Sequence, residues 1–333
     1  MQSQSCAAVV IAAPASGQGK TTVTAVLARH YRQQNKQVRV FKVGPDFLDP
    51  MVLEYASGHP VYQLDLWMVG KQHSQQLLAE AAQQADIILI EGVMGLFDGE
   101  PSTADLAAAF GIPILAVIDA SSMAQTFAAI AVGLDQYRKD TRVAAVIANK
   151  VGSERHADML KKALPNTLPC LATLFRQTEH ALPSRYLGLQ QANEVTDLEQ
   201  RLSHTLDAFD FDNTVSLPNI DFPFIDVEPL PLLLEGVKIG IARDAAFSFL
   251  YQANLDCLEA LGADLIFFSP LTDKQLPDID SLYLPGGYPE LHLETLSQNT
   301  NMIQSIHQHY HANKPIIAEC GGMLYLCESL TDK

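Results

Sequence analysis

The sequence lacks the features that mark membrane proteins and disulfide-stabilised secreted domains. No apolar run is long enough to cross a bilayer, and the apolar stretch at residues 7–14 leads straight into a glycine-rich loop, so we interpret it as a strand rather than a signal peptide. The five cysteines are scattered, odd in number and without metal-type pairs. This pattern favours reduced thiols, and we expect a cytoplasmic protein without a membrane partner.

Positive charge is also scarce. The 333 residues include 22 Lys and Arg against 38 Asp and Glu, which gives a formal net charge of −16, and no Lys/Arg run stands out. This balance argues against a nucleic-acid partner, so an acidic ligand would have to meet a local basic site. Hydrophobic residues make up 48 % of the chain, enough for ordinary buried cores.

Strand-like and helix-like segments alternate through the first part of the chain. The strand-like runs are nearly continuous in apolar residues, as in parallel strands that are covered on both faces. They lie at 7–14, 37–44, 85–92, 112–120 and 142–150, and helical patterns lie at 21–35, 71–84, 103–110, 122–138 and 153–163. The alternation predicts an α/β domain with a doubly wound, mostly parallel sheet over residues 1–206.

A change of composition separates this domain from a second one. Residues 207–235 are rich in Pro and Asp and have no helical or strand period, so we interpret them as a linker. A second alternation follows, with strands near 237–244, 264–270, 281–287 and 315–320 and helices near 249–261 and 298–313. It predicts a second α/β domain over residues 236–333, which looks incomplete.

A glycine-rich loop between the first strand and the first helix predicts a nucleotide site. In APASGQGKTT, residues 13–22, glycines let backbone N–H groups turn toward phosphate oxygens at a helix N-terminus. The lysine would reach the β- and γ-phosphates and the first threonine would bind Mg²⁺. Pro14 stands at the first glycine position of the common motif. The expected ATP-binding residues in this loop are Ser16, Gly17, Gly19, Lys20, Thr21 and Thr22.

Acidic residues at or just past the ends of the predicted strands could complete a magnesium site. Ligands collect at the carboxyl ends of strands in open parallel sheets, and Mg²⁺ takes one or two carboxylates besides phosphate and water. Asp46, Glu91 and Asp119 occupy such positions, with Asp49 and Asp98 on the adjoining loops. We expect Thr21, Asp46 and Glu91 to hold the metal.

Several long motifs resemble those of the cobyrinate a,c-diamide synthases, a family of glutamine-dependent amidotransferases of cobalamin biosynthesis. The resemblance runs from about residue 7 to the end of the chain. The motifs include KVGPDFLDP, EGVMGLFDG, DASSMAQTFAA, NKVGSERH, LPSRYLGL, LYLPGGYPELH and AECGGMLYL. The resemblance implies an N-terminal ATP·Mg²⁺ module similar to dethiobiotin synthetase and a C-terminal class I glutaminase module.

The family chemistry gives expectations for further residues. ATP would convert a carboxylate of a corrinoid to an acyl phosphate, and ammonia from glutamine would replace the phosphate. Lys42 would act with Lys20 and Asp46 near the acceptor carboxylate, and Asn149 would face the adenine. Weaker candidates for substrate contacts are Asp49, Asp98, Arg155 and Arg185.

Cys320 is the candidate nucleophile of the glutaminase module. It follows the apolar run 315–318 and precedes Gly321 and a helical pattern, and a helix N-terminus favours the reactive thiolate. Backbone N–H groups of Gly286 and Gly287 could hold the oxyanion. The other four cysteines we interpret as buried structural thiols: Cys6, Cys170, Cys257 and Cys327.

A cysteine nucleophile needs a histidine base, and no histidine follows Cys320. Upstream, His307, His309 and His311 lie on a polar helical pattern, which indicates solvent exposure rather than a triad or a metal site. We therefore expect a truncated version of the enzyme, in which the last part of the glutaminase module is missing and glutamine hydrolysis is lost or impaired.

Other functions stay open at this point. The same chemistry could act on hydrogenobyrinate or on a nickel sirohydrochlorin. A P-loop switch ATPase of the partitioning type is a different class, although Ser16 and Gly17 stand where such proteins commonly carry a second lysine. The C-terminal half could also be a glutamine-binding regulatory module without catalysis. The oligomeric state is open too, with a homodimer among the options.

Overall fold

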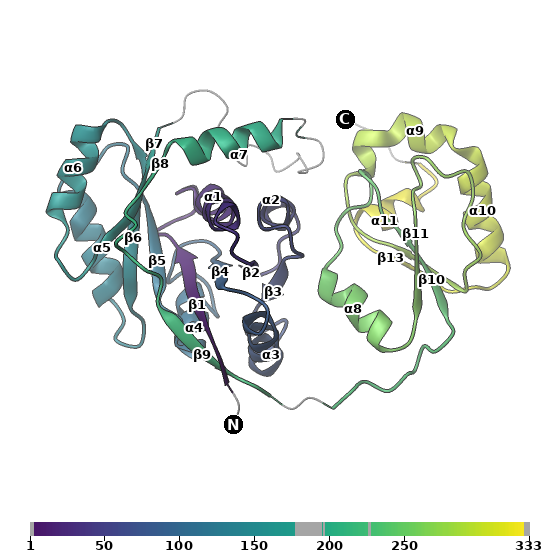
Figure 1. Ribbon diagram of the computed structural model, residues 1–333. Coiled ribbons are helices and arrows are strands. Elements are labelled where there is room, and N and C mark those ends of the chain that lie inside the picture. The colour runs from purple at the N-terminus through teal and green to yellow at the C-terminus, as the bar shows by residue number, and fades with distance from the viewer. Residues whose placement is uncertain (1–2, 177–194, 196, 226–227, 330–333) are drawn as a thin grey trace. The chain divides into compact units, whose positions relative to one another are not determined.

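The computed structural model describes residues 3–176, 195, 197–225 and 228–329. The chain forms two compact units, Met1–Asp226 and Val227–Lys333 (Figure 1). We describe each unit by itself.

The first unit is built on a nine-stranded sheet. The strand order is β3-β2-β4-β1-β5-β6-β7-β8, and β9 pairs with β1 off this path. All pairs are parallel except β1 with β9 and β7 with β8. The strands are β1 (Ser3–Ala12), β2 (Val38–Val43), β3 (Tyr62–Leu64), β4 (Ile87–Glu91), β5 (Ile114–Asp119), β6 (Val143–Val151), β7 (Cys170–Phe175), β8 (Phe209–Phe211) and β9 (Asn219–Pro223).

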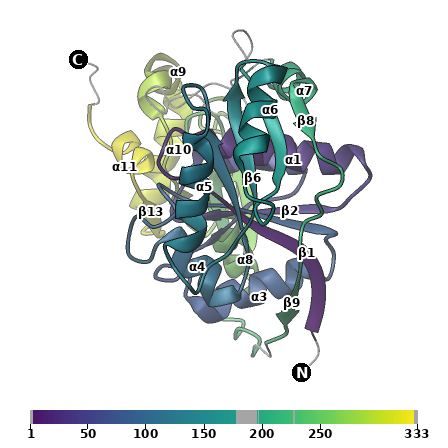
Figure 2. The same ribbon diagram turned by 90° about the vertical axis from the view of Figure 1, so that its left-hand side faces the viewer.

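Helices cover both faces of this sheet (Figures 1 and 2). On β1, Val10 packs into one core and its neighbours Val9 and Ile11 pack into the other, so alternate side chains of a continuous apolar run are all buried. The first core includes residues of α3 (Lys71–Ala82), α4 (Thr103–Phe110), α5 (Thr126–Gln136) and α6 (Glu154–Ala163). The second includes residues of α1 (Lys20–Gln33), α2 (Leu48–Ser57) and α7 (Leu198–Asp207).

The second unit contains a four-stranded parallel sheet with the order β11-β10-β12-β13. Its strands are β10 (Lys238–Ala242), β11 (Asp264–Phe268), β12 (Ser281–Leu284) and β13 (Ile316–Ala318). Its helices are α8 (Gln252–Ala260), the 3₁₀ helix η2 (Pro289–His292), α9 (Leu293–Gln298), α10 (Thr300–His311) and α11 (Gly321–Tyr325). Core residues lie on both sides of the sheet, with Leu284 in one cluster and Ile241 in the other.

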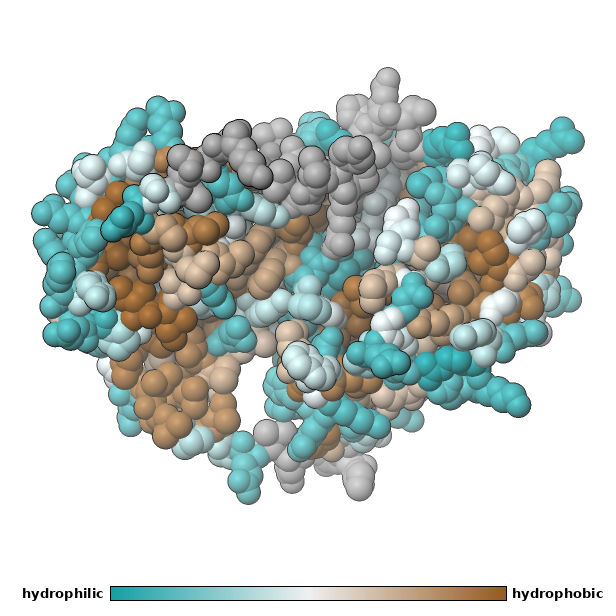
Figure 3. All heavy atoms as spheres, turned by 180° about the vertical axis from the view of Figure 1, so that it is seen from behind, coloured by the Kyte–Doolittle hydropathy of each residue, from teal (hydrophilic) through white to brown (hydrophobic). Residues whose placement is uncertain are grey.

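Some hydrophobic side chains stay at the surface, as the view from behind shows in brown (Figure 3). In the second unit, Leu233 is 74 % exposed, and Ile317 on the edge strand β13 is 62 % exposed. The strand β13 is therefore an open edge of the described sheet.

The structure differs from the expected linker at 207–235. Strands β8 and β9 lie inside this range, and β9 pairs with the amino-terminal part of β1, where Phe222 is buried at 2 % exposure. The division between the units falls at Asp226 and Val227, inside the same range. Short strands whose partners are distant in sequence show little periodicity of hydrophobic residues. For this reason the composition alone suggested a linker.

Candidate functional site

The glycine-rich loop lies between β1 and α1, at the carboxyl edge of the first sheet. Gly19 is the N-cap of α1 and has a φ of 92°, a conformation that favours glycine. A Cβ at Gly19 would lie 2.3 Å from Asn149 Nδ2. Any other residue at this position would therefore have a strained backbone and a side chain that clashes with Asn149. Of the other expected loop residues, Ser16 and Gly17 are exposed and Thr22 is half-buried.

Asn149 braces this loop. Asn149 on β6 pairs with Asp119 at the end of β5, and its side chain is buried at 4 % exposure. Its Nδ2 donates a hydrogen bond of 2.7 Å to the carbonyl oxygen of Gln18. The side chain of Gln18 in turn accepts the backbone N–H of Asp119 at 2.8 Å. The side-chain amide of Asn149 thus contacts the loop backbone, and its expected contact with adenine stays a prediction.

Lys20 connects the loop to the segment after β4. Its side chain is buried, and Nζ donates to the Met94 carbonyl at 2.6 Å. Met94 has a φ of 51°, which turns its backbone away from the strand path. Met94 was not predicted, because a backbone carbonyl contact leaves no signal in the residue type.

Thr21 and Glu91 meet at the same edge. Thr21 Oγ1 donates to Glu91 Oε1 at 2.7 Å, and Glu91 is 1 % exposed. The other oxygen of Glu91, Oε2, is buried and has no hydrogen-bond partner among the described residues. Burial raises the pKa of Glu91, and the neighbouring Lys42 ammonium opposes that effect.

Lys42 lies among three carboxylates. Its Nζ is 2.7 Å from Asp49 Oδ2, 3.0 Å from Glu91 Oε1 and 3.6 Å from Asp46 Oδ2. Burial alone would lower the pKa of Lys42, but the carboxylates of Glu91, Asp49 and Asp46 together raise it above its usual value. We refer to these four residues as the lysine–carboxylate cluster. With one ammonium among three carboxylates, the cluster has an excess of negative charge when all are ionised.

The donor chemistry here suits a hard divalent cation. A hydroxyl, Thr21 Oγ1, and an unpartnered buried carboxylate oxygen, Glu91 Oε2, are the oxygen ligands that Mg²⁺ takes together with water and phosphate. Within the described residues, no group of three or more His, Cys, Asp or Glu side chains is arranged to hold a metal ion. This agrees with the geometry, because the Lys42 ammonium lies between the carboxylates.

Other expected site residues lie apart from the cluster contacts. Asp98 is exposed and its Oδ2 accepts the Gly95 N–H at 3.1 Å. Asp119, considered for the metal, forms an ion pair of 2.6 Å with Lys150, which sequence reasoning had not used. Arg155 is exposed on α6. Arg185 lies outside the described residues.

Cys320 lies on a strained turn between β13 and α11. It is exposed and adopts φ 50° and ψ −117°, an unusual conformation for a residue other than glycine. The loop after β12 touches this turn: a Cβ at Gly286 would lie 3.2 Å from Cys320 Cβ, and one at Gly321 would lie 3.0 Å from the Gly287 nitrogen. The structure therefore brings the cysteine and the two candidate oxyanion glycines together.

A tyrosine pairs with the residue before the cysteine. Tyr283 Oη on β12 donates a short hydrogen bond to Glu319 Oε1. Burial raises the pKa of Tyr283, and the adjoining Glu319 carboxylate raises it further. Tyr283 was missed in the sequence, because only the register of β12 with β13 brings it beside Glu319.

The remaining cysteines and histidines divide by burial. Burial raises the pKa of Cys6 and Cys170 to about 11, as expected for structural thiols. Cys257 and Cys327 are exposed, so the expectation of a buried thiol is wrong for these two. The helix α10 exposes two of its histidines but buries His309, whose Nε2 lies 3.2 Å from the Pro315 carbonyl oxygen.

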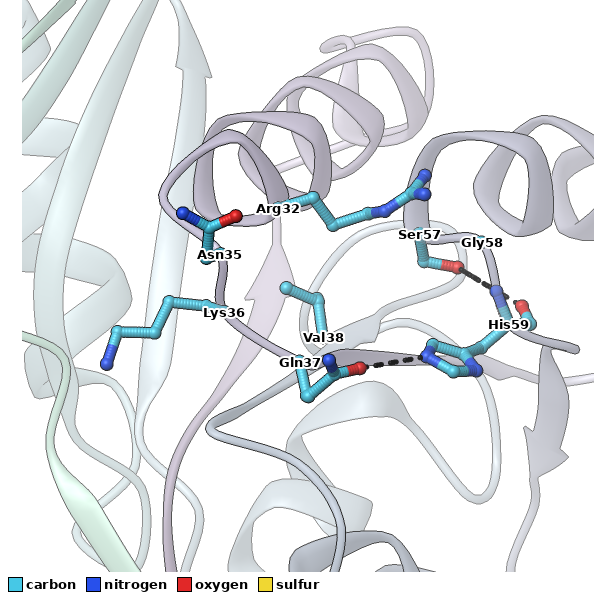
Figure 4. Close-up of a pocket in the computed structure, with 8 residues that line it drawn as sticks. All are labelled: Arg32, Asn35, Lys36, Gln37, Val38, Ser57, Gly58 and His59. Atoms are coloured by element: carbon cyan, nitrogen blue, oxygen red, sulfur yellow. Dashed lines mark hydrogen bonds between the residues drawn. The ribbon is translucent and has the colours of Figure 1, made fainter.

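A polar pocket of ≈ 240 Å³ lies at the opposite edge of the first sheet, where β2 begins (Figure 4). Arg32 lines it, but its guanidinium donates to the Ala56 carbonyl at 2.9 Å and so supports the end of α2. His59 Nε2 lies 3.4 Å from Gln37 Oε1. None of the expected site residues lines this pocket.

Comparisons with known proteins agree with this geometry. The CobQ/CobB/MinD/ParA nucleotide binding domain matches residues 9–186, and the CobB/CobQ-like glutamine amidotransferase domain matches residues 238–333. A protein of Stutzerimonas stutzeri named hydrogenobyrinate a,c-diamide synthase is 60 % identical over 334 residues, which cover 100 % of this chain and 78 % of that protein. The chain belongs to the a,c-diamide synthase family. The resemblance inferred from the motifs is confirmed.

Other members of the a,c-diamide synthase family support this assignment. The Pseudomonas aeruginosa hydrogenobyrinate a,c-diamide synthase is 58 % identical, over 98 % of this chain and 75 % of that protein. The Herminiimonas arsenicoxydans cobyrinate a,c-diamide synthase is 50 % identical, over 97 % and 74 %. Among solved structures, FtsY from Elizabethkingia anophelis in complex with GDP has a TM-score of 0.38 and 16 % sequence identity. The match covers 50 % of this chain and 57 % of that one, and this likeness is too slight for further argument.

The expected fold class is confirmed as well, because a P-loop α/β unit with a mostly parallel sheet precedes a second α/β unit. Across the described ranges, no helix is long and apolar enough to span a bilayer.

Proposed function

We propose that the chain catalyses the ATP-dependent amidation of the a and c acetate carboxylates of a cobyrinate-type macrocycle, with glutamine as the source of ammonia. The observation that supports this most directly is the carboxyl edge of the first sheet. There Lys20 and Thr21 follow the P-loop, and the lysine–carboxylate cluster lies on the ends of β2 and β4 and on the segment that leads from β2 into α2.

The first step would transfer the γ-phosphoryl group of ATP to a carboxylate oxygen of the macrocycle, giving an acyl phosphate and ADP. Backbone N–H groups of the loop from Ser16 to Thr22 would hold the phosphates, and Lys20 would exchange its Met94 contact for phosphate oxygens. Mg²⁺, when bound, would neutralise charge on the phosphates. Thr21, Glu91 and Asp46 would hold it.

Lys42 would orient the acceptor carboxylate. A buried ammonium that three carboxylates keep protonated can donate to a fourth carboxylate that enters the site. Ammonia would then attack the acyl carbon, and inorganic phosphate would leave. Asp49, the carboxylate nearest to the ammonium, would hold Lys42 in place.

Ammonia would come from the second unit. The Cys320 thiolate would attack the side-chain carbonyl of glutamine, while the Gly286 and Gly287 N–H groups bind the oxyanion. The C–N bond would break as the amide nitrogen takes a proton from water and leaves as ammonia, and the acyl group would stay on sulfur until water hydrolyses the thioester. The positive φ of Cys320 supports this role, because strained turns of this kind present a nucleophile to substrate.

The substrate macrocycle could be either of two closely related molecules, cobyrinate and hydrogenobyrinate. The two relatives at 60 % and 58 % identity are both named for hydrogenobyrinate, whereas the relative at 50 % identity is named for cobyrinate. Hydrogenobyrinate is therefore the first alternative to cobyrinate as substrate. A competition assay with equal concentrations of both macrocycles would separate them by the ratio of diamide products.

The test of the proposed function is direct. The protein is incubated with macrocycle, ATP and Mg²⁺, with ammonium or glutamine as nitrogen source, and the diamide is followed by mass spectrometry. We expect product and stoichiometric ADP with ammonium, and lost or impaired product formation with glutamine. ATP turnover that is independent of a macrocycle would instead favour a P-loop switch ATPase. We expect the protein in the cytoplasm, and size-exclusion chromatography with light scattering would test whether it forms a homodimer.

A further inference from the structure

The loop after β3 presents an exposed tryptophan. Trp67 is the only tryptophan of the chain, and it is 85 % exposed. Asp65 fixes the turn that carries it: Asp65 Oδ1 accepts the N–H groups of Trp67 and Met68 at 2.8 and 2.7 Å, and the Asp65 carbonyl accepts those of Val69 and Gly70. The backbone that carries the indole is thus held by four hydrogen bonds.

This loop begins beside the proposed acceptor site. In the strand order β3-β2-β4, Leu64 at the end of β3 pairs with Val43 at the end of β2, one residue beyond Lys42. Gln63 Nε2 also donates to the Asp46 carbonyl at 3.3 Å, which connects β3 to the loop after β2. Trp67 follows Leu64 by three residues, so its Cα lies within about 11 Å of the Leu64 Cα.

Two further exposed hydrophobic side chains lie on loops at the same edge. Met68 is 40 % exposed next to Trp67, and Met94, on the loop after β4, is 44 % exposed. Since β2 lies between β3 and β4, the loops that carry these side chains follow the two strands on either side of β2, the strand that carries Lys42. Single exposed hydrophobic residues are common, but a group of them beside a buried charged site is typical of a binding surface.

We propose that Trp67 stacks against the face of the macrocycle and places a carboxylate of its rim near Lys42. This inference rests on the proposed function. The occupant follows from the two kinds of chemistry at this edge, because a conjugated ring system offers an apolar face to an aromatic side chain and a carboxylate rim to an ammonium. Trp67 is then a positioning residue that contributes to macrocycle affinity and not to ATP binding.

The test compares Trp67→Ala and Trp67→Phe with the wild type, using hydrogenobyrinate and cobyrinate as probes and ammonium as nitrogen source. We expect Trp67→Ala to raise the KM for the macrocycle about tenfold, as for loss of a stacked ring, with the KM for ATP unchanged. Trp67→Phe should stay within about threefold of wild type, because it keeps an aromatic face. Tyr137→Ala removes another exposed aromatic residue, 73 % exposed at the end of α5, and should leave the macrocycle KM unchanged.

Calorimetry of macrocycle binding without ATP distinguishes a failure of the Trp67 proposal from a failure of the proposed function. If wild type binds and converts the macrocycle and Trp67→Ala does so equally well, the role of Trp67 is refuted and the proposed function stands. If wild type neither binds nor converts either macrocycle, the proposed function fails and the stacking proposal fails with it. If Trp67→Ala changes the molar mass by light scattering with an unchanged macrocycle KM, the tryptophan belongs to a protein interface and the proposal is wrong.

Discussion

The hydroxyl of Thr21 donates a 2.7 Å hydrogen bond to the buried carboxylate of Glu91, which joins the first turn of α1 to the end of β4. These residues are 70 positions apart, and only the order of β1 beside β4 brings them together. The bond fixes one carboxylate oxygen and leaves the other, Oε2, without a hydrogen-bond partner in the described parts of the chain. This relationship leads to the first prediction.

Thr21→Val keeps the size of the side chain but removes the hydroxyl. We expect kcat/KM for ATP to fall by about 10–100-fold, as when a partner of a metal site is lost. The measurement is the ammonium-dependent rate over a range of Mg²⁺ concentrations. Thr21→Ser keeps the hydroxyl and should stay near wild type; equal losses in both variants would contradict a role for the hydroxyl.

Lys42→Met would leave three carboxylates around a buried site without their cation. We expect the free energy of unfolding in urea to fall by about 3 kcal/mol, because an uncompensated buried charge remains. The control is Lys161→Met, which breaks the more exposed 3.0 Å ion pair with Asp210 and should cost below about 1 kcal/mol. A similar small loss in both variants would show that the cluster does not depend on its ammonium.

Gly19→Ala introduces a Cβ that would lie 2.3 Å from Asn149 Nδ2, at a φ of 92°. We expect ATP affinity, measured by calorimetry, to fall at least tenfold, because the loop and its Asn149 brace must both shift. Gly111→Ala is the matched control: its φ of 64° is also positive, but nothing lies within 4 Å of the added Cβ. It should lower stability by about 1–2 kcal/mol and leave ATP affinity unchanged.

The start of α4 should be sensitive to acid. Burial alone would raise the pKa of Asp105, but hydrogen bonds from the Ser102 backbone and from Arg138 hold it below its usual value. Because the folded pKa is the lower one, the stabilisation is present above the unfolded value of about 3.9 and is lost as pH falls through the folded value.

Urea midpoints of wild type and Asp105→Asn at several pH values test this sign. The urea midpoint of wild type should exceed that of Asp105→Asn at pH 7, and this difference should disappear as the pH falls below about 4. A difference in urea midpoint that is constant down to pH 2.5 would mean that the charge of Asp105 contributes nothing to stability.

Cys320→Ala tests the nitrogen source. We expect it to remove any glutamine-dependent diamide while the ammonium-dependent rate stays within about twofold of wild type, because the synthetase chemistry lies in the other unit. Cys257→Ala removes a different exposed thiol and should change neither rate. An equal loss with both nitrogen sources would contradict a glutaminase role for Cys320.

The sequence predicted the elements that carry strong local periods and missed those that depend on distant partners. The strands β1, β2, β4, β5 and β6 lie within their predicted runs to within a few residues, because each is a buried apolar segment. The short strands β8 and β9 were missed, since their pairing with β7 and β1 supplies what their composition does not. The residue types of the site were predictable, but the Lys42 contact with Glu91 required the register of β2 with β4, and its contact with Asp49 required the turn from β2 into α2.

The pairing of β9 with β1 has a consequence for how the first unit is made. Ser3 pairs with Pro223, so the amino-terminal part of β1 has no neighbour on that side until the ribosome has released the chain beyond β9. The first strand to emerge is thus the last to be completed, and the backbone N–H and C=O groups of its amino-terminal part stay unpaired during synthesis and open to other chains. Chaperone dependence during translation should therefore end only after residue 223 has left the exit tunnel.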